Sequence, residues 1–192
     1  MIDELERAIS LTAPVLVGLV AHGLCMKFGW LMRQAVPIDA GHTFRGRRFL
    51  GENKTWRGVI AVGFGTAIGF LLRAEWSDAS QLATEPAWLH RLSASTFAFG
   101  LFVGVSAMLF ELPNSFVKRQ LDIRPGEQGH RATGFIFYVV DQIDMLVGIC
   151  LALAFAVPVT PQFVLWSAVF LFVAHQIITV IGYGLGMRAT WR

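Results

Sequence analysis

Apolar residues gather in five long segments of the chain, at 11–32, 57–73, 94–112, 134–157 and 162–186. Each segment is close to the ~20 residues that a helix needs to cross the hydrocarbon core of a bilayer. The second segment is the shortest. It can span the bilayer if the side chains of Arg57 and Arg73, at its two ends, extend to the membrane interfaces. The pattern predicts an all-α integral membrane protein with five transmembrane helices, forming one transmembrane domain over residues 1–192.

The composition changes this picture little but excludes an ordinary soluble domain. Hydrophobic residues make up 55% of the chain and charged residues 15%, where about a quarter charged is typical of soluble domains. The mean hydropathy is +0.57. Cys25 and Cys150 both lie in apolar segments, which is typical of small buried side chains rather than of a disulfide.

Charge bias between the segments predicts the orientation of the chain. The connections 33–57 and 113–131 and the C-terminal tail together carry twelve Lys and Arg residues, whereas the other side has three. Basic residues accumulate on the cytoplasmic side of membrane proteins. We therefore expect the N-terminus outside, the C-terminus in the cytoplasm and two long basic cytoplasmic loops, in a multi-pass protein of the plasma (inner) membrane.

Two carboxylates, Asp141 and Asp144, stand three residues apart inside the apolar stretch FYVVDQIDMLVG. Ionisable groups in a transmembrane segment are costly and usually face a cavity. On a helix this spacing puts both on one face, which suits a divalent cation such as Mg²⁺. Two interpretations stay open on the residues alone: metal or proton chemistry, or a pair held by Lys or Arg from a neighbouring helix.

The first cytoplasmic connection reads PIDAGHTFRGRRFLGENKTWRG, from Pro37 to Gly58. It combines glycines with basic residues and with the hydroxyl or amide side chains of Asn53 and Thr55. Glycines let backbone amides approach an anion, and Arg or Lys neutralise phosphate charge. The loop therefore indicates phosphate binding, although basic residues that only fix topology and touch anionic lipid remain an alternative.

The second cytoplasmic connection is expected to begin at Glu111, because Pro113 makes continuation of a regular helix costly. Ser115, Lys118 and Arg119 follow in this predicted loop. Glu111 would then lie at the same, cytoplasmic, side of the membrane from which the helix with the Asp pair enters. We predict a pocket sunk below the cytoplasmic surface.

At these residues the chain resembles a known family. Glu111-x-x-x-Ser115-Phe-Val-Lys118-Arg119, then Pro125-Gly126, then Asp141-Gln-Ile-Asp144 is similar to the signature of the membrane CTP-transferases. The short chain and the loop DAGHTFRGRRFLGENKTWRG resemble the CDP-archaeol synthase branch. The family's first acidic residue is usually Asp, whereas this chain has Glu111.

The resemblance implies transfer of CMP from CTP to a lipid phosphate, with Mg²⁺, at the cytoplasmic face. It implies catalytic roles for Asp141, Asp144, Lys118 and Arg119, and metal ligation by Asp141, Asp144 and Glu111. The expected substrate-binding residues are Arg45, Asn53, Lys54, Thr55, Arg57 and Ser115. The expected partners are CTP, a lipid phosphate and membrane lipid, without nucleic acid, and a homodimer is one arrangement that the resemblance allows.

Two other functions compete with this interpretation. A CDP-alcohol phosphotransferase also uses membrane aspartates, but its widely spaced Asp series is absent from the sequence. An ion-coupled transporter would use a proton or cation relay formed by Asp141, Asp144, His22 and His175. That function would not explain why the two cytoplasmic loops are suited to binding phosphate. The sequence does not identify the lipid, because apolar helix surfaces carry no readable code for it.

Overall fold

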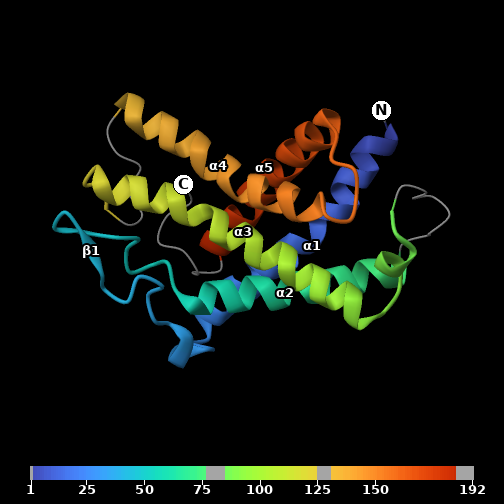
Figure 1. Cartoon of the computed structure of the whole chain (residues 1–192), viewed down its shortest axis with the longest axis horizontal. Helices are drawn as coiled ribbons and strands as arrows, with labels where there is room; N and C mark the ends of the chain where they lie inside the picture. The colour runs from blue at the N-terminus through green and yellow to red at the C-terminus, as the bar shows by residue number, and fades with distance from the viewer. Residues whose placement is uncertain (1, 77–84, 125–130, 185–192) are drawn as a thin grey trace.

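The computed structural model describes residues 2–76, 85–124 and 131–184. Successive helices run in opposite directions along the long axis of the molecule (Figure 1). The described residues contain five helices that are long and apolar enough to cross a membrane, as predicted. They are α1 (Ile2–Lys27), α2 (Trp56–Trp76), α3 (Ala94–Gln120), α4 (Arg131–Leu153) and α5 (Pro161–Gly184).

The first helix begins earlier than the apolar pattern predicted, at Ile2 instead of residue 11. Its polar first turns are ordered by contacts with the distant α4–α5 connection. The buried guanidinium of Arg7 donates to the carbonyl oxygen of Pro158 at 2.5 Å and lies 5.4 Å from the centroid of the Phe163 ring. An acidic first turn, with Asp3 and Glu4, also suits a helix N-terminus.

The third helix contradicts the prediction of a loop after Glu111, because it continues through Pro113 to Gln120. Proline within a helix removes one backbone hydrogen bond and costs about 3 kcal/mol. The last two turns offset this cost through buried contacts, since Ser115, Lys118 and Arg119 are all buried. The second basic connection is therefore much shorter than expected, and its signature residues stand on a helix.

The close packing of α1 against α2 depends on glycines of α2. A Cβ placed on Gly65 would lie 2.6 Å from Gly18 Cα, and one on Gly69 would lie 2.6 Å from the carbonyl oxygen of Pro14. At such distances only the hydrogen atom of a glycine fits between the two helices. At the end of α5, in contrast, a Cβ on Gly184 would meet nothing within 4 Å.

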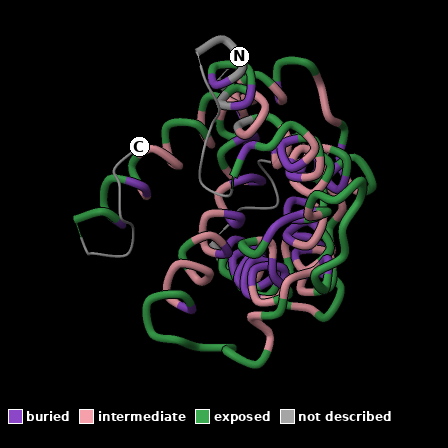
Figure 2. Tube along the Cα trace, turned by 90° about the vertical axis from the view of Figure 1, so that its left-hand side faces the viewer, coloured by how far each residue is buried: buried purple, intermediate pink, exposed green. Residues whose placement is uncertain are grey.

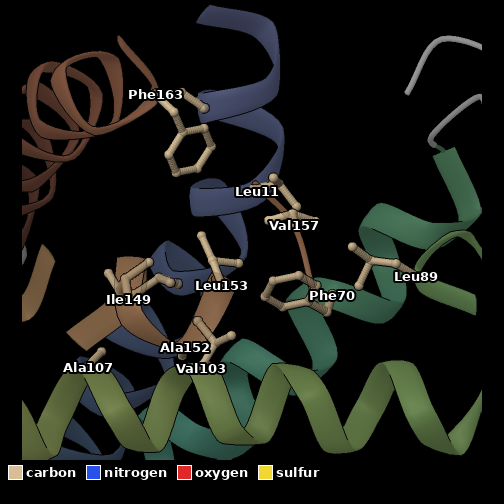
Figure 3. Close-up of a cluster of buried hydrophobic side chains, with 12 residues drawn as sticks. Leu11, Phe70, Leu89, Val103, Ala107, Ile149, Ala152, Leu153, Val157 and Phe163 are labelled. Atoms are coloured by element: carbon tan, nitrogen blue, oxygen red, sulfur yellow. The ribbon is translucent and has the colours of Figure 1, made fainter. Parts of the chain in front are cut away.

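The largest buried cluster lies where α1 to α4 meet near the end of the molecule that carries the N-terminus (Figures 1 and 3). Leu11, Phe70 and Ile149 are fully buried there, and Leu89, from the connection before α3, joins them. At the same end Arg73 is buried and donates to Glu85 at 2.6 Å. Arg73 is thus held by a carboxylate of the connection before α3.

The helix α5 stands apart from this arrangement. It packs mainly along α1 and touches α4 much less. Viewed from the end of the molecule, the helix that leads to the C-terminus is mostly exposed or half-buried, whereas buried positions concentrate among the other helices (Figure 2).

The first loop folds over the end of α3. It contains the short 3₁₀ helix η1 (Met32–Gln34) and a hairpin of β1 (Thr43–Phe44) and β2 (Arg47–Arg48). Figure 1 shows the hairpin beside the C-terminal end of α3. Arg47 donates to the carbonyl oxygen of Gln120 and to Asp122, so the loop is fastened to the helix that bears the signature.

Candidate active site

A polar pocket of about 280 Å³ lies where the first loop meets α3, α4 and α5. Most of the residues singled out from the sequence line it, although they come from separate parts of the chain. The lining residues are Asn53 and Lys54 of the loop, Glu111, Asn114, Ser115, Lys118 and Arg119 of α3, Asp141, Asp144 and Met145 of α4, and His175 of α5.

The two aspartates of α4 are held by side chains of α3. Lys118 Nζ donates to both oxygens of Asp141, at 2.5 and 2.6 Å. Asn114 Nδ2 donates to Asp141 Oδ1 at 2.6 Å and to Asp144 Oδ2 at 2.8 Å. Asp144 Oδ1 also accepts from the amide of Met145. Asp141 is therefore ion-paired, Asp144 is held by hydrogen bonds, and both carboxylates line the pocket, while metal or proton chemistry at the pair stays a prediction.

A second ion pair crosses the pocket between the loop and α3. Lys54 donates to Glu111 Oε2, and both side chains are largely buried. The predicted phosphate-binding lysine and the predicted third metal ligand are thus partners of each other in this structure. Glu111 reaches the same pocket as the Asp pair, but its carboxylate is directed to Lys54.

Arg119 connects the loop to the end of α3. Its Nε donates to the carbonyl oxygen of Leu50 at 3.1 Å, and its Nη1 donates to the carbonyl oxygen of Ile123. Gly51, next to Leu50, has φ of 104°, and a Cβ there would lie 2.7 Å from Arg119 Nε. A glycine is therefore needed at this junction, both for its backbone conformation and for space.

The loop that bears Lys54 is organised around Asp39, a buried residue that the sequence analysis did not single out. Its carboxylate accepts hydrogen bonds from the amides of Gly41, Leu50 and Gly51 and from the guanidinium of Arg48. Burial alone would raise the pKa of Asp39, but Arg48 and the three amides together hold it well below its usual range. An Asp shortly before a glycine is a common turn signal, and it could have identified this residue.

Three predicted substrate-binding residues lie outside the pocket lining in the described part of the chain. Arg45 is on the hairpin turn, 5.2 Å from the centroid of the Phe44 ring. Arg57 Nη1 approaches Met32 Sδ at 3.6 Å, and Thr55 is buried where the chain enters α2. Their binding of substrate stays a prediction, as does that of the signature residues Pro125 and Gly126, which lie outside the described residues.

Two lining residues were missed or set aside from the sequence. Asn114 was read as part of a loop, yet Glu111, Asn114, Ser115 and Lys118 follow helical spacing and share one face of α3. That spacing is the signal that could have found Asn114. His175 was named only in the relay of the competing transporter hypothesis, and the structure brings it to the pocket from α5.

The oxygen donors of the pocket fit the Mg²⁺ that the sequence predicts. Asp141 and Asp144 face one cavity, and Asn114 Oδ1 is buried with no hydrogen-bond partner among the described residues. Carboxylate and amide oxygens are common ligands of hard cations. As the side chains stand, no three His, Cys, Asp or Glu residues of the described chain converge closely enough to hold a metal. Ligation by Glu111 therefore stays a prediction.

Five apolar helices with a charged pocket between them define a multi-pass membrane protein with a site inside its helical bundle. A solved structure of an intramembrane enzyme for archaeal membrane lipids biosynthesis has a similar fold. The TM-score is 0.64 at 22% identity, and the match covers 92% of this chain and 94% of that one.

A family model described as CarS-like CDP-archaeol synthase matches residues 11–192. The CDP-archaeol synthase of Methanosphaerula palustris is 31% identical over 160 residues, which are 79% of this chain and 87% of the relative. That of Halobacterium salinarum is 34% identical over 164 residues, covering 79% and 81%. The chain belongs to the CDP-archaeol synthase family, as the signature indicated, and it is an enzyme, a cytidylyltransferase that uses CTP.

Proposed function

We propose that this enzyme transfers the CMP group of CTP to the phosphate of a membrane lipid, giving a CDP-lipid and pyrophosphate for phospholipid biosynthesis. The observation that carries the proposal is the pocket itself, where two ammonium groups and three carboxylates face one cavity between membrane helices: Lys54, Lys118, Glu111, Asp141 and Asp144. The names of the relatives, which are CDP-archaeol synthases, support a CDP-lipid as the product.

In the proposed reaction, an oxygen of the lipid phosphate attacks the α-phosphorus of CTP. A new P–O bond forms while the bond from the α-phosphorus to the oxygen that bridges to the β-phosphate breaks. Pyrophosphate leaves with that oxygen and its electron pair. A lipid phosphate is already ionised near neutral pH, so the nucleophile needs no general base.

The chain's own cations supply the binding of the triphosphate. Lys118 is bound to Asp141 and Lys54 to Glu111, so both ammonium groups are already removed from bulk water. When a phosphate replaces the carboxylate as the partner of either lysine, no further free energy is therefore needed to remove the ammonium group from water. Lys54 and Lys118 would then hold the triphosphate and stabilise the leaving pyrophosphate. Asn53 and Ser115 are expected to donate hydrogen bonds to phosphate or cytosine.

Asp141, Asp144 and the amide oxygen of Asn114 are the residues that would hold Mg²⁺, which, when bound, neutralises phosphate charge as a Lewis acid. Asn114 has a further role in this proposal. Because its Nδ2 donates to both carboxylates, it keeps the two side chains turned to the same cavity. Such partners of metal ligands fix the orientation of the ligands.

We place the site on the cytoplasmic side of the plasma membrane. The concentration of Lys and Arg at the end of the bundle that bears the pocket supports this orientation. The lipid is a phosphate monoester with two hydrocarbon chains, either isoprenoid ethers or acyl esters.

Incubation of the purified protein with Mg²⁺, each of the four ribonucleoside triphosphates and a panel of lipid phosphates tests the proposal. The panel should contain isoprenoid ether and diacyl lipids. We expect release of pyrophosphate that requires both CTP and a lipid phosphate, with formation of the CDP-lipid. Release without lipid would indicate hydrolysis, and either that result or no release at all would contradict the proposal.

A further inference from the structure

The polar pocket adjoins a second, apolar cavity of about 40 Å³ between α1, α4 and α5. Three residues line both spaces: Asp141 and Met145 on α4 and His175 on α5. The other lining residues of the second cavity are all apolar, namely Leu19, Leu146, Leu171 and Phe172. The boundary between a charged space and an apolar space therefore passes along Asp141 and His175.

The junctions between the first four helices are closed by glycines. A Cβ on any of these glycines would lie within 2.8 Å of the neighbouring helix, so a hydrocarbon chain cannot pass between the two helices at these positions. The contacts join α1 to α2, α2 to α3 and α3 to α4. The glycines are Gly65 and Gly69 on α2, Gly100 and Gly104 on α3, and Gly148 on α4.

The junction between α4 and α5 is different. The two helices touch little, and α5 is the least buried of the five. It carries large exposed apolar residues, such as Leu165 and Ile177, and α4 also exposes large apolar residues, such as Ile143 and Val147. We call the contact region between these two helices, Arg131–Leu153 and Pro161–Gly184, the α4–α5 junction. It is the place where the pocket borders on loosely packed apolar surface.

We propose that the α4–α5 junction binds the hydrocarbon end of the lipid phosphate. The phosphate lies in the polar pocket near Lys118, the glycerol atoms pass His175 into the apolar cavity, and the chains leave between the two helices into the bilayer. An amphiphile needs a charged and an apolar compartment in contact, and the shared wall of Asp141 and His175 provides that contact. A space of about 40 Å³ takes a few atoms, which suits the glycerol end and not a whole chain.

This inference rests on the proposed function, and photocrosslinking tests it in the wild-type protein. The probes are a diacyl and an isoprenoid ether lipid phosphate, each with a diazirine on the first carbons of one chain, in nanodiscs. We expect labelling, suppressed by excess unlabelled lipid phosphate, on peptides that contain Leu146, Leu171 or Phe172. Suppressible labelling confined to the separate α1–α2 groove would overturn the inference, as would the absence of suppressible labelling. That groove is lined by Ser10, Ala13, Pro14, Val17, Gly69, Leu72 and Arg73.

A kinetic test uses substitutions on α5. Leu171→Trp fills the apolar cavity, and we expect it to raise the KM for the lipid phosphate at least tenfold while the KM for CTP changes less than twofold. The matched control is Ile68→Trp, which adds the same side chain to an exposed position of α2 away from the junction and should change neither constant. Phe172→Ala, which enlarges the cavity, should also alter the lipid KM alone.

The outcomes separate this inference from the proposed function. If the wild type makes a CDP-lipid but Leu171→Trp and Phe172→Ala leave the lipid KM unchanged, the inference is wrong and the function stands. If Leu171→Trp does not fold, Phe172→Ala and the crosslinking still decide. If the wild type releases no lipid-dependent pyrophosphate, the proposed function itself fails.

Discussion

Asp141 and Asp144 are stabilised in the membrane by two side chains that have different effects on charge. Lys118 compensates the charge of Asp141, whereas Asn114 contributes hydrogen bonds to both carboxylates and no charge. Asp144 is held by hydrogen bonds from Asn114 and the amide of Met145. These hydrogen bonds bring no positive charge to the Asp144 carboxylate, which is a physical reason for a divalent cation to bind there.

Replacement of either aspartate by asparagine tests this assignment. Asp141→Asn and Asp144→Asn keep the shape of the side chain and remove its charge. We expect each to lower CTP turnover at least 100-fold, about 3 kcal/mol of transition-state stabilisation, with an unchanged gel-filtration profile. Asp122→Asn is the control, because Asp122 is exposed and pairs with Arg47 on the surface. Full activity in either pocket variant would contradict the assignment.

Asp39 predicts a pH dependence of the first loop. A carboxylate whose pKa is lowered by folding stabilises the protein above its unfolded pKa of about 4, and this stabilisation is lost as the pH falls toward the folded value. We expect Asp39→Asn to lower the melting temperature by about 5–10 °C at pH 7, since charged hydrogen bonds are lost. The difference from wild type should stay constant from pH 8 to 5 and shrink below pH 4.

Intrinsic tryptophan fluorescence during heating in detergent measures this difference, with Asp122→Asn as an exposed comparison. A difference that already closes between pH 7 and pH 5 would show that Asp39 is not the group responsible.

At the scale of the elements, α3 turns a linear signature into a binding surface. Because the helix continues through Pro113, Glu111, Asn114 and Lys118 are presented on one face toward α4 and the loop. A loop of the same sequence would have no fixed relation among these side chains. The proline rule is local, and contacts with residues far away in sequence, such as Lys54 and Asp141, outweigh it.

The junction of the first loop with α3 gives a prediction at this scale. Gly41 and Gly51 both have positive φ, of 84° and 104°, but a Cβ meets Arg119 at Gly51 and nothing within 4 Å at Gly41. Both alanine variants should lose about 1 kcal/mol of stability from backbone strain. We expect Gly51→Ala, in addition, to raise the KM for CTP, since it displaces Arg119 and the loop that bears Lys54. Equal effects of the two variants on stability and KM would contradict this role of the junction.

At the scale of the whole molecule, the pocket and the Arg73–Glu85 pair lie at opposite ends of the helices. The first loop and the end of α3 form one end of the molecule, and the connections before α3 and after α4 form the other (Figure 1). This arrangement makes the orientation of the bundle testable at two exposed positions, Glu52 and Arg91.

We expect Arg91→Cys, but not Glu52→Cys, to react with a membrane-impermeant thiol reagent in intact cells, in a background where Cys25 and Cys150 are replaced by alanine. Both positions should react after the membrane is permeabilised, which controls for accessibility. Reaction of Glu52→Cys alone in intact cells would place the pocket outside and contradict the proposed cytoplasmic site.

The sequence by itself determined the five helices and the place of Asp141 and Asp144 on one face of one of them. Both features are local: a long apolar run can satisfy its backbone in a bilayer as a helix, and a carboxylate within such a run is costly wherever the helix packs. The family signature likewise stands within one short stretch of chain, from Glu111 to Arg119, completed by the Asp pair.

The tertiary structure decided which basic residues reach the pocket. Lys54 and Lys118 line it, Arg45 and Arg57 do not, and composition treats all four alike. It also decided that α3 continues past Pro113 and that the α4–α5 junction stays loosely packed. These features depend on contacts between segments distant in the chain, whose free energies exceed local preferences and cannot be read from a single stretch of sequence.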